Sequence, residues 1–194
     1  IIMSRNSPDT SLRVFKAIEH YGLGITRAVL ASGASLAPYL TAFRTDLFLS
    51  AYEDDVQSAI DSNIAAGIIC TDGLYTYDCE HQIRQIRIAF DGDAVLFSDE
   101  SERIYQEQGL EAFEENERQN ARNPLKAGPF AKFLMTLSEF QKDCKTQEAP
   151  IRTALVTTRC APAHERVIRT LRAWNVRIDE MFFLGGVCKK DVLK

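Results

Sequence analysis

Two aspartates separated by one glycine follow a short apolar run, a pattern suited to phosphate chemistry. The run Ile86–Phe90 leads into Asp91, Gly92 and Asp93, and a second apolar stretch follows. At the carboxyl end of a parallel strand, where such sheets bind ligands, one carboxylate can attack phosphorus while the other carries the leaving group's proton. Paired carboxylates also suit Mg²⁺, which prefers oxygen ligands. An ordinary Asp-Gly-Asp turn is the alternative interpretation.

Two later segments end in groups that can bind phosphate oxygens. The apolar run Ala154–Thr157 ends in a hydroxyl, which can either donate a hydrogen bond to phosphate or cap the following helix. The run Met181–Leu184 leads through Gly185 and Gly186 to Lys189, at an expected helix start. A lysine there opposes the helix dipole unless an anion lies beside it. Lys189 is therefore a candidate phosphate ligand, and a solvated surface lysine is the alternative.

The elements that must position these groups alternate between strand and helix. This alternation predicts an α/β fold, with a doubly wound parallel sheet covered by helices. The predicted strands are residues 1–4, 28–32, 47–50, 68–70, 86–90, 154–157 and 181–184. The predicted helices are residues 9–21, 54–66, 129–144 and 161–174. The three candidate segments then end at one edge of the sheet.

Residues 98–127 differ from the rest because they are polar, acidic and poor in β-branched side chains. We expect a small helical insertion that leaves the sheet after residue 91. Most of its acids are expected on a solvated helical face: Asp99, Glu100, Glu102, Glu107, Glu111, Glu114, Glu115 and Glu117.

A faint internal repeat divides the chain. Residues 4–40 align without gaps on residues 157–193, with the same predicted order of elements. The chemistry is not repeated, because Leu36 stands opposite Lys189. We therefore expect a degenerate half at residues 1–75, a linker at 71–84 and a catalytic core at 84–194 that carries the insertion.

Composition excludes several functional classes. The chain has 194 residues, 45% of them hydrophobic and 26% charged, which is typical of a globular protein with a sizeable core. A net charge of -4 argues against nucleic-acid binding. No apolar run reaches the ~18 residues that a membrane span needs. Five cysteines without a C-x-x-C pair argue against a disulfide framework or a zinc site and favour the cytoplasm.

The order of Asp-x-Asp, strand-end threonine and lysine resembles the haloacid dehalogenase superfamily of phosphotransferases. The segment 90–102, FDGDAVLFSDESE, is more closely similar to the type I cytosolic 5′-nucleotidases. The second half adds Asn123-Pro124-Leu125, Gly128-Pro129 and Arg152–Thr157 to this resemblance. The first half adds the less specific, mostly apolar segments Leu47–Ala51, Ala59–Asp61 and Ile64–Gly67.

The resemblance implies a role for each candidate. Asp91 would be the nucleophile that forms an aspartyl phosphate, and Asp93 would act as general acid and then as general base. The Asp91 carboxylate and the Asp93 backbone carbonyl would hold Mg²⁺. Gly92, Thr157 and Lys189 would bind phosphate, and residues 98–127 would form a cap. The implied reaction is magnesium-dependent hydrolysis of nucleoside 5′-monophosphates such as AMP, by a haloacid-dehalogenase-like, Rossmannoid fold.

The sequence departs from the superfamily pattern at one point, so other functions stay open. The superfamily has a further acidic pair on the strand after the lysine helix, and this sequence reaches Lys194 without it. Asp54 and Asp55, beside the corresponding strand of the first half, are weak substitutes. We therefore expect a piece of a longer chain. A nucleotide- or phosphate-binding module without turnover is one alternative, and an unrelated doubly wound domain is another. The expected partner is a nucleoside monophosphate, with neither nucleic acid nor membrane, and a homo-oligomer is left open.

Overall fold

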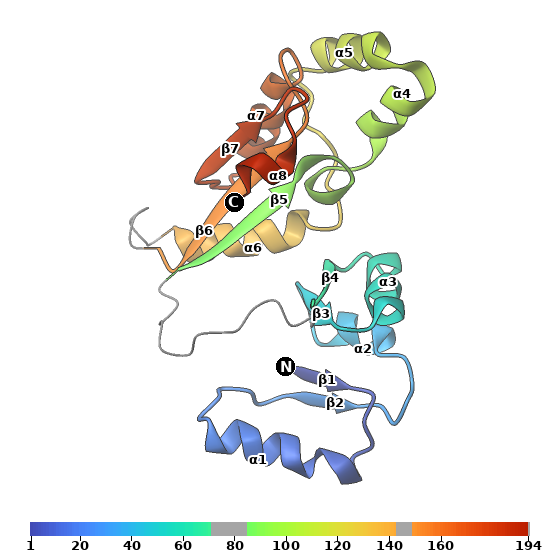
Figure 1. Ribbon diagram of the computed structural model, residues 1–194, viewed down its shortest axis with the longest axis vertical. Coiled ribbons are helices and arrows are strands. Elements are labelled where there is room, and N and C mark those ends of the chain that lie inside the picture. Colours follow the sequence, from blue (N-terminus) through green and yellow to red (C-terminus); the bar gives the residue numbers. More distant parts are fainter. Residues whose placement is uncertain (71–84, 143–148, 194) are drawn as a thin grey trace. The chain divides into compact units, whose positions relative to one another are not determined.

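The computed structural model describes residues 1–70, 85–142 and 149–193 and forms two compact units, Ile1–Asp72 and Gly73–Lys194 (Figure 1). Both are mixed α/β structures with parallel strands, compatible with a Rossmann-like fold. The single doubly wound sheet, the internal repeat and the bounds of the two halves stay predictions. The predicted linker at 71–84 lies outside the described residues. Within the described ranges, no helix is long and apolar enough to cross a membrane.

The first unit contains two separate two-stranded parallel sheets, β1–β2 and β3–β4. Its elements are β1 (Ile2–Ser4), the short 3-10 turn η1 (Asp9–Ser11), α1 (Leu12–His20), β2 (Ala28–Leu30), α2 (Ala37–Ala42), β3 (Phe48–Ser50), α3 (Glu53–Asp61) and β4 (Ala66–Ile68). A common core joins the elements because Leu40, Phe48 and Val56 are buried together, with Met3 and Val29 packed against them. The unit is therefore one packed body.

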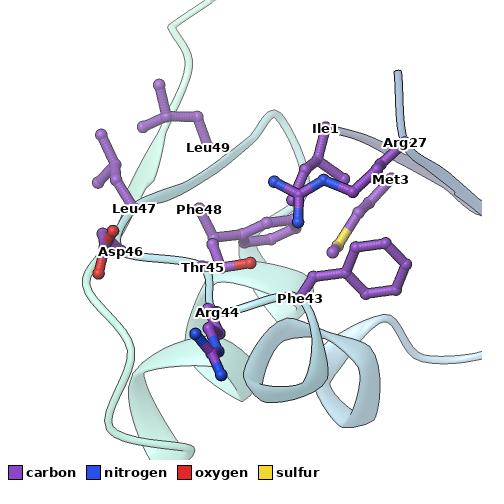
Figure 2. Close-up of a pocket in the computed structure, with 10 residues that line it drawn as sticks. All are labelled: Ile1, Met3, Arg27, Phe43, Arg44, Thr45, Asp46, Leu47, Phe48 and Leu49. Atoms are coloured by element: carbon purple, nitrogen blue, oxygen red, sulfur yellow. The ribbon is translucent and has the colours of Figure 1, made fainter. Parts of the chain in front are cut away.

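A hollow of about 390 Å³ opens in this first unit (Figure 2). It is lined by Ile1, Met3, Arg27, Phe43, Arg44, Thr45, Asp46, Leu47, Phe48 and Leu49. Its lining contains only one carboxylate, that of Asp46, together with two arginines. The hollow therefore does not offer the paired acids that the predicted phosphate chemistry requires.

The second unit contains one three-stranded parallel sheet in the order β5–β6–β7. Its elements are β5 (Ile86–Asp91), the wide turn η2 (Gly92–Leu96), α4 (Glu100–Gln108), α5 (Leu110–Gln119), α6 (Ala131–Gln141), β6 (Ile151–Thr157), α7 (His164–Ala173), β7 (Glu180–Phe183) and α8 (Lys189–Val192). Phe90 and Leu155 of the sheet share a core with Leu134 of α6 and with Val167 and Leu171 of α7. This core fixes the strands whose ends carry the candidate residues.

Polar residues shift two element boundaries from their predicted positions. Strand β6 begins at Ile151 rather than at Ala154, because the sheet gives the polar positions partners: Arg152 bonds to Glu180 at 2.7 Å and the Thr153 N–H bonds to Asp179 at 2.9 Å. Helix α3 ends at Asp61 rather than near residue 66. Asn63 there adopts a φ of 58°, a left-handed conformation that ends helices.

Candidate active site

The end of β5 and the turn that follows it form the centre of the candidate site. The Phe97 N–H donates to the Gly92 carbonyl at 3.0 Å and closes the turn. The Gly92 N–H donates to Oδ1 of Asp91 at 2.7 Å. The chain leaves the strand immediately after Asp91, and Asp93 lies within the turn. The two carboxylates therefore have different surroundings.

Asp91 is paired with the lysine that the sequence singled out. The Nζ atom of Lys189 donates to Oδ2 of Asp91 at 2.5 Å, and both side chains are partly exposed. Lys189 follows β7 through a turn in which Gly185 and Gly186 have φ values of 53° and 100°. Glycine adopts this left-handed conformation without the steric cost of a Cβ. The anion beside Lys189 in the structure is thus the carboxylate of Asp91.

Thr157, the third predicted residue, lies next to Gly92. It ends β6, is buried, and its hydroxyl accepts a hydrogen bond from the Arg159 N–H at 3.3 Å. A Cβ added at Gly92 would lie 3.1 Å from Oγ1 of Thr157. The close approach of the turn to this hydroxyl therefore favours glycine at position 92.

Asp93 faces a buried arginine rather than Asp91. Oδ2 of Asp93 accepts from Nε of Arg159 at 2.9 Å, and Oδ1 accepts from Nη2 at 2.5 Å. The Arg159 side chain is only 2% exposed. Two parallel bonds of this kind fix the orientation of a carboxylate as well as its position. Arg159 therefore fixes the orientation of the Asp93 carboxylate.

The same arginine bonds to Glu117 of α5, which corrects the prediction of a solvated acid at this position. Nη1 of Arg159 lies 2.6 Å from Oε2 of Glu117, whose side chain is fully buried. Oε1 of Glu117 accepts from Nη1 of Arg166 at 2.9 Å and from the Ser101 hydroxyl at 2.8 Å. A buried carboxylate needs such partners, because an unpaired charge is costly away from water.

These two acids change the protonation equilibrium of Arg159. Burial by itself lowers the pKa of a guanidinium, because it disfavours the charged form. The hydrogen bonds and charge of Asp93, followed by the charge and hydrogen bond of Glu117, outweigh that effect and raise the pKa of Arg159. Arg159 is therefore a permanent positive charge in this site.

A hollow of about 440 Å³ opens beside Asp93 and Arg159. It is lined by Asp93, Glu102, Tyr105, Leu110, Phe113, Thr158, Arg159, Gly185 and Gly186. The rings of Tyr105 and Phe113 meet edge to face with their centroids 6.2 Å apart, and the Arg159 guanidinium lies 5.3 Å from the Phe113 centroid. The predicted insertion, α4 and α5, thus supplies one wall of the hollow and the strand ends supply the other. The threonine in its lining is Thr158, not Thr157.

The segment that begins with Gly128-Pro129 is hydrogen-bonded to the turn that follows Asp91. The Gly128 N–H donates to the Leu96 carbonyl at 2.8 Å, and the Phe130 N–H donates to the Val95 carbonyl at 3.0 Å. A Cβ at Gly128 would lie 2.4 Å from the Phe97 carbonyl oxygen. Only glycine lets the two backbone segments approach this closely.

The donor atoms near Asp91 suit a hard cation. Among the described residues, no three or more His, Cys, Asp or Glu side chains gather around a common metal position. Mg²⁺ commonly takes one or two carboxylates and completes its shell with water and substrate phosphate oxygens. The Asp91 carboxylate, which is partly exposed, and the Asp93 backbone carbonyl are oxygen donors of the kind that Mg²⁺ prefers, and their role as its ligands stays a prediction.

The structure brings four of the predicted residues close together, and their roles stay predictions. Asp91, Gly92 and Thr157 lie at or next to the ends of the adjacent strands β5 and β6, and Lys189, at the start of α8, bonds to Asp91. Arg159, which bonds to Asp93, and Glu117 and Arg166, which bond to each other beside it, were not among the predicted site residues. No local signal in the sequence marked Glu117 as buried, since its partners Arg159 and Arg166 lie far along the chain.

Comparison with known proteins assigns the family. The family model described as 5′-nucleotidase matches residues 1–194. Human cytosolic 5′-nucleotidase 1B is 39% identical over 198 residues, an alignment that covers 100% of this chain and 32% of the human protein. The chain therefore spans about a third of the length of that relative, and no solved structure matches it. By the match over its whole length, this chain belongs to the 5′-nucleotidase family.

Proposed function

We propose that this chain carries the phosphate-transfer site of a hydrolase that converts nucleoside 5′-monophosphates to nucleosides and phosphate. The observation that carries the proposal is the pair of Lys189 Nζ and Asp91 Oδ2, 2.5 Å apart at the end of a parallel sheet. A nucleophilic carboxylate beside a fixed ammonium group can receive a phosphate dianion, because the ammonium offsets its charge. Membership of the 5′-nucleotidase family supports the same reaction.

In the first step, an oxygen of Asp91 attacks phosphorus and the bond to the ester oxygen breaks. Asp93 gives its proton to that oxygen, so the nucleoside leaves as a neutral alcohol and Asp91 carries the phosphoryl group. Lys189 binds the phosphoryl oxygens during the transfer, and the hydroxyl of Thr157 and the backbone N–H of Gly92 are further candidate donors. Gly92 keeps the turn close enough to Thr157 for this arrangement.

In the second step, water replaces Asp91 on the phosphorus atom. Asp93, now ionised, takes a proton from the attacking water, while the bond between Asp91 and phosphorus breaks. Phosphate is released, Asp91 is again a carboxylate and Asp93 is again protonated. One pair of carboxyl groups therefore completes a cycle in which atoms and charge balance.

The Asp91 carboxylate and the Asp93 backbone carbonyl are the groups that would hold Mg²⁺. The ion would add positive charge beside the transferring phosphoryl oxygens. Lys189 occupies one carboxylate oxygen of Asp91 in the structure. Lys189 and the ion would then both offset the negative charge of the phosphoryl group.

The hollow beside Asp93 supports a nucleoside as the leaving group. Its volume of about 440 Å³ falls within the usual range for small-molecule sites. Tyr105, Leu110 and Phe113 give it an apolar wall suited to a flat base. Its position at Asp93 puts this wall on the side of the residue that protonates the leaving group. An AMP-like substrate in the cytoplasm remains the expectation from the sequence.

Phosphate release from AMP in the presence of Mg²⁺ tests the proposal. We expect Asp91→Asn to lower the rate by at least about 10³-fold, because the amide cannot act as the nucleophile. A chelator should abolish the activity of the unmodified chain. Asp99→Asn is the matched control, since Asp99 is exposed at the start of α4 and its side chain pairs with Arg103 of that helix. Equal rates for the chain and for Asp91→Asn would refute the assignment.

A second candidate is a nucleotide-binding module without turnover. It is favoured by the contacts of the two carboxylates, because both oxygens of Asp93 accept bonds from Arg159 and one oxygen of Asp91 accepts a bond from Lys189. This candidate predicts that AMP raises the melting temperature while no phosphate is released. Phosphate release that depends on Asp91 would exclude it.

A further inference from the structure

A buried chain of charges connects the carboxylate of Asp93 to the inserted helices. Arg159 makes two hydrogen bonds to Asp93, at 2.9 and 2.5 Å, and a third to Glu117 of α5, at 2.6 Å. Its guanidinium is thus fixed from both sides by carboxylates. Phe113, one turn before Glu117 on the same helix, lies against the same guanidinium at 5.3 Å.

Glu117 is in turn hydrogen-bonded to residues of two other helices. It accepts hydrogen bonds from Arg166 of α7 and from Ser101 of α4, at 2.9 and 2.8 Å. It has no exposed surface and does not line the hollow beside Asp93. Any effect of Glu117 on the reaction must therefore pass through the residues it holds, and Arg159 is the one that reaches Asp93.

We propose that Arg159 is a positioning residue for proton transfer by Asp93, and that Glu117 aligns Arg159 for this task. The inference rests on the proposed function, because it concerns the proton that Asp93 gives to the leaving group. In the structure, both oxygens of Asp93 face Arg159. One of them must exchange its bond to Arg159 for a bond to the ester oxygen, while the other remains on the guanidinium and keeps the carboxyl group aimed at the hollow.

Two substrates with different leaving groups can distinguish this role from a purely structural one. A nucleoside leaves through an alkoxide oxygen, which needs a proton as its bond to phosphorus breaks. A p-nitrophenolate ion is stable enough to leave without one. Both substrates need Asp91 and Lys189 equally. Misalignment of Asp93 should therefore slow the transfer from AMP and leave the transfer from p-nitrophenyl phosphate almost unchanged.

The test measures single-turnover transfer from both substrates for the unmodified chain and for Glu117→Gln, which keeps the size of the side chain. We expect the rate with AMP to fall by about 10²-fold, the scale of general acid catalysis, with KM in steady state changed less than about threefold. The rate with p-nitrophenyl phosphate should stay within about threefold. Glu115→Gln is the matched control, because Glu115 lies on the same helix but is exposed and pairs with Arg118.

Each outcome has a distinct meaning. Equal losses with both substrates would overturn the positioning role and leave the proposed function intact. Turnover of neither substrate by the unmodified chain would refute the proposed function, and the inference would fall with it. If Glu117→Gln melts below the assay temperature, Arg159→Lys is the second variant. It keeps the buried positive charge but cannot form the two parallel bonds. The proposal therefore predicts that this variant, too, loses rate with AMP and not with p-nitrophenyl phosphate.

Discussion

The Nζ atom of Lys189 lies 2.5 Å from Oδ2 of Asp91, although the two residues are 98 positions apart in the sequence. In the sheet order β5–β6–β7, the strand that ends in Asp91 and the strand that precedes Lys189 lie on either side of β6, whose end carries Thr157. A carboxylate and a hydroxyl thus come from the ends of two adjacent parallel strands, and the ammonium group comes from the start of α8, the helix that follows the third strand. That edge is where open α/β sheets commonly bind ligands.

Removal of the ammonium group should impair the reaction more than the fold. We expect Lys189→Met to lower kcat/KM for AMP by about 10²-fold, since it removes one fixed positive group from the phosphoryl site. The partly exposed side chain makes a small change in melting temperature the expected result. Lys190→Met is the matched control, because Lys190 is exposed and adjacent in sequence. Equal losses in the two variants would show that the Asp91–Lys189 pair has no specific role.

Gly128 should be essential for stability. A Cβ there would lie 2.4 Å from the Phe97 carbonyl oxygen and 2.5 Å from that of Val95, and backbone atoms cannot rotate away. We expect Gly128→Ala to lower the free energy of unfolding by about 3 kcal/mol, the upper end of the cost of overpacking. Urea denaturation measures the change. Gly24→Ala is the control, because no atom lies within 4 Å of its added Cβ, and a comparable loss there would contradict the steric explanation.

Asp179 should make stability depend on pH. Its buried side chain, 1% exposed, accepts bonds from the Thr153 N–H and from Gln141, both at 2.9 Å, and pairs with Arg177. Burial alone would raise the pKa of this carboxyl group, but the bonds from Thr153, Arg177 and Gln141 lower it. We expect Asp179→Asn to reduce the free energy of unfolding by about 2 kcal/mol at neutral pH, because charged hydrogen bonds are lost.

The sign of this effect follows from the lowered pKa. The stabilisation by the charge is fully present above the unfolded-state pKa, about 3.9, and is lost as pH falls through the lower folded-state pKa. The stability difference between the chain and Asp179→Asn should therefore narrow below about pH 4. Denaturation curves recorded from pH 7 to pH 3 measure it. A difference that stays constant across this range would contradict the role of the charge.

Part of the site was predictable because its residues follow recognisable strands. Asp91 and Thr157 each end a short apolar run, and Lys189 follows a third run and a glycine turn. Parallel strands bring such ends together whatever the intervening sequence contains. The start of β6 was less predictable, because Arg152 and Thr153 look like loop residues until Glu180 and Asp179 supply partners from elsewhere.

The charges behind Asp93 were not predictable in the same way. Glu117 is one of eight acids in a polar segment, and nothing local separates it from exposed Glu115. Its burial depends on Arg159 and Arg166, which stand 42 and 49 positions further along the chain. Which of several similar acidic side chains is buried and paired therefore depends on the tertiary fold. The orientation of the Asp93 carboxylate follows from the bonds that Arg159 makes to Asp93 and to Glu117.

The most direct test of the account is to locate the phosphoryl group during turnover. The chain is incubated with AMP and Mg²⁺, quenched in acid, digested and mapped by mass spectrometry. We predict one phosphoryl group on Asp91, labile to hydroxylamine as an acyl phosphate must be, and absent from Asp91→Asn. Phosphate release with no phosphoryl group on Asp91 at any time, or with that group on another residue, would contradict the account.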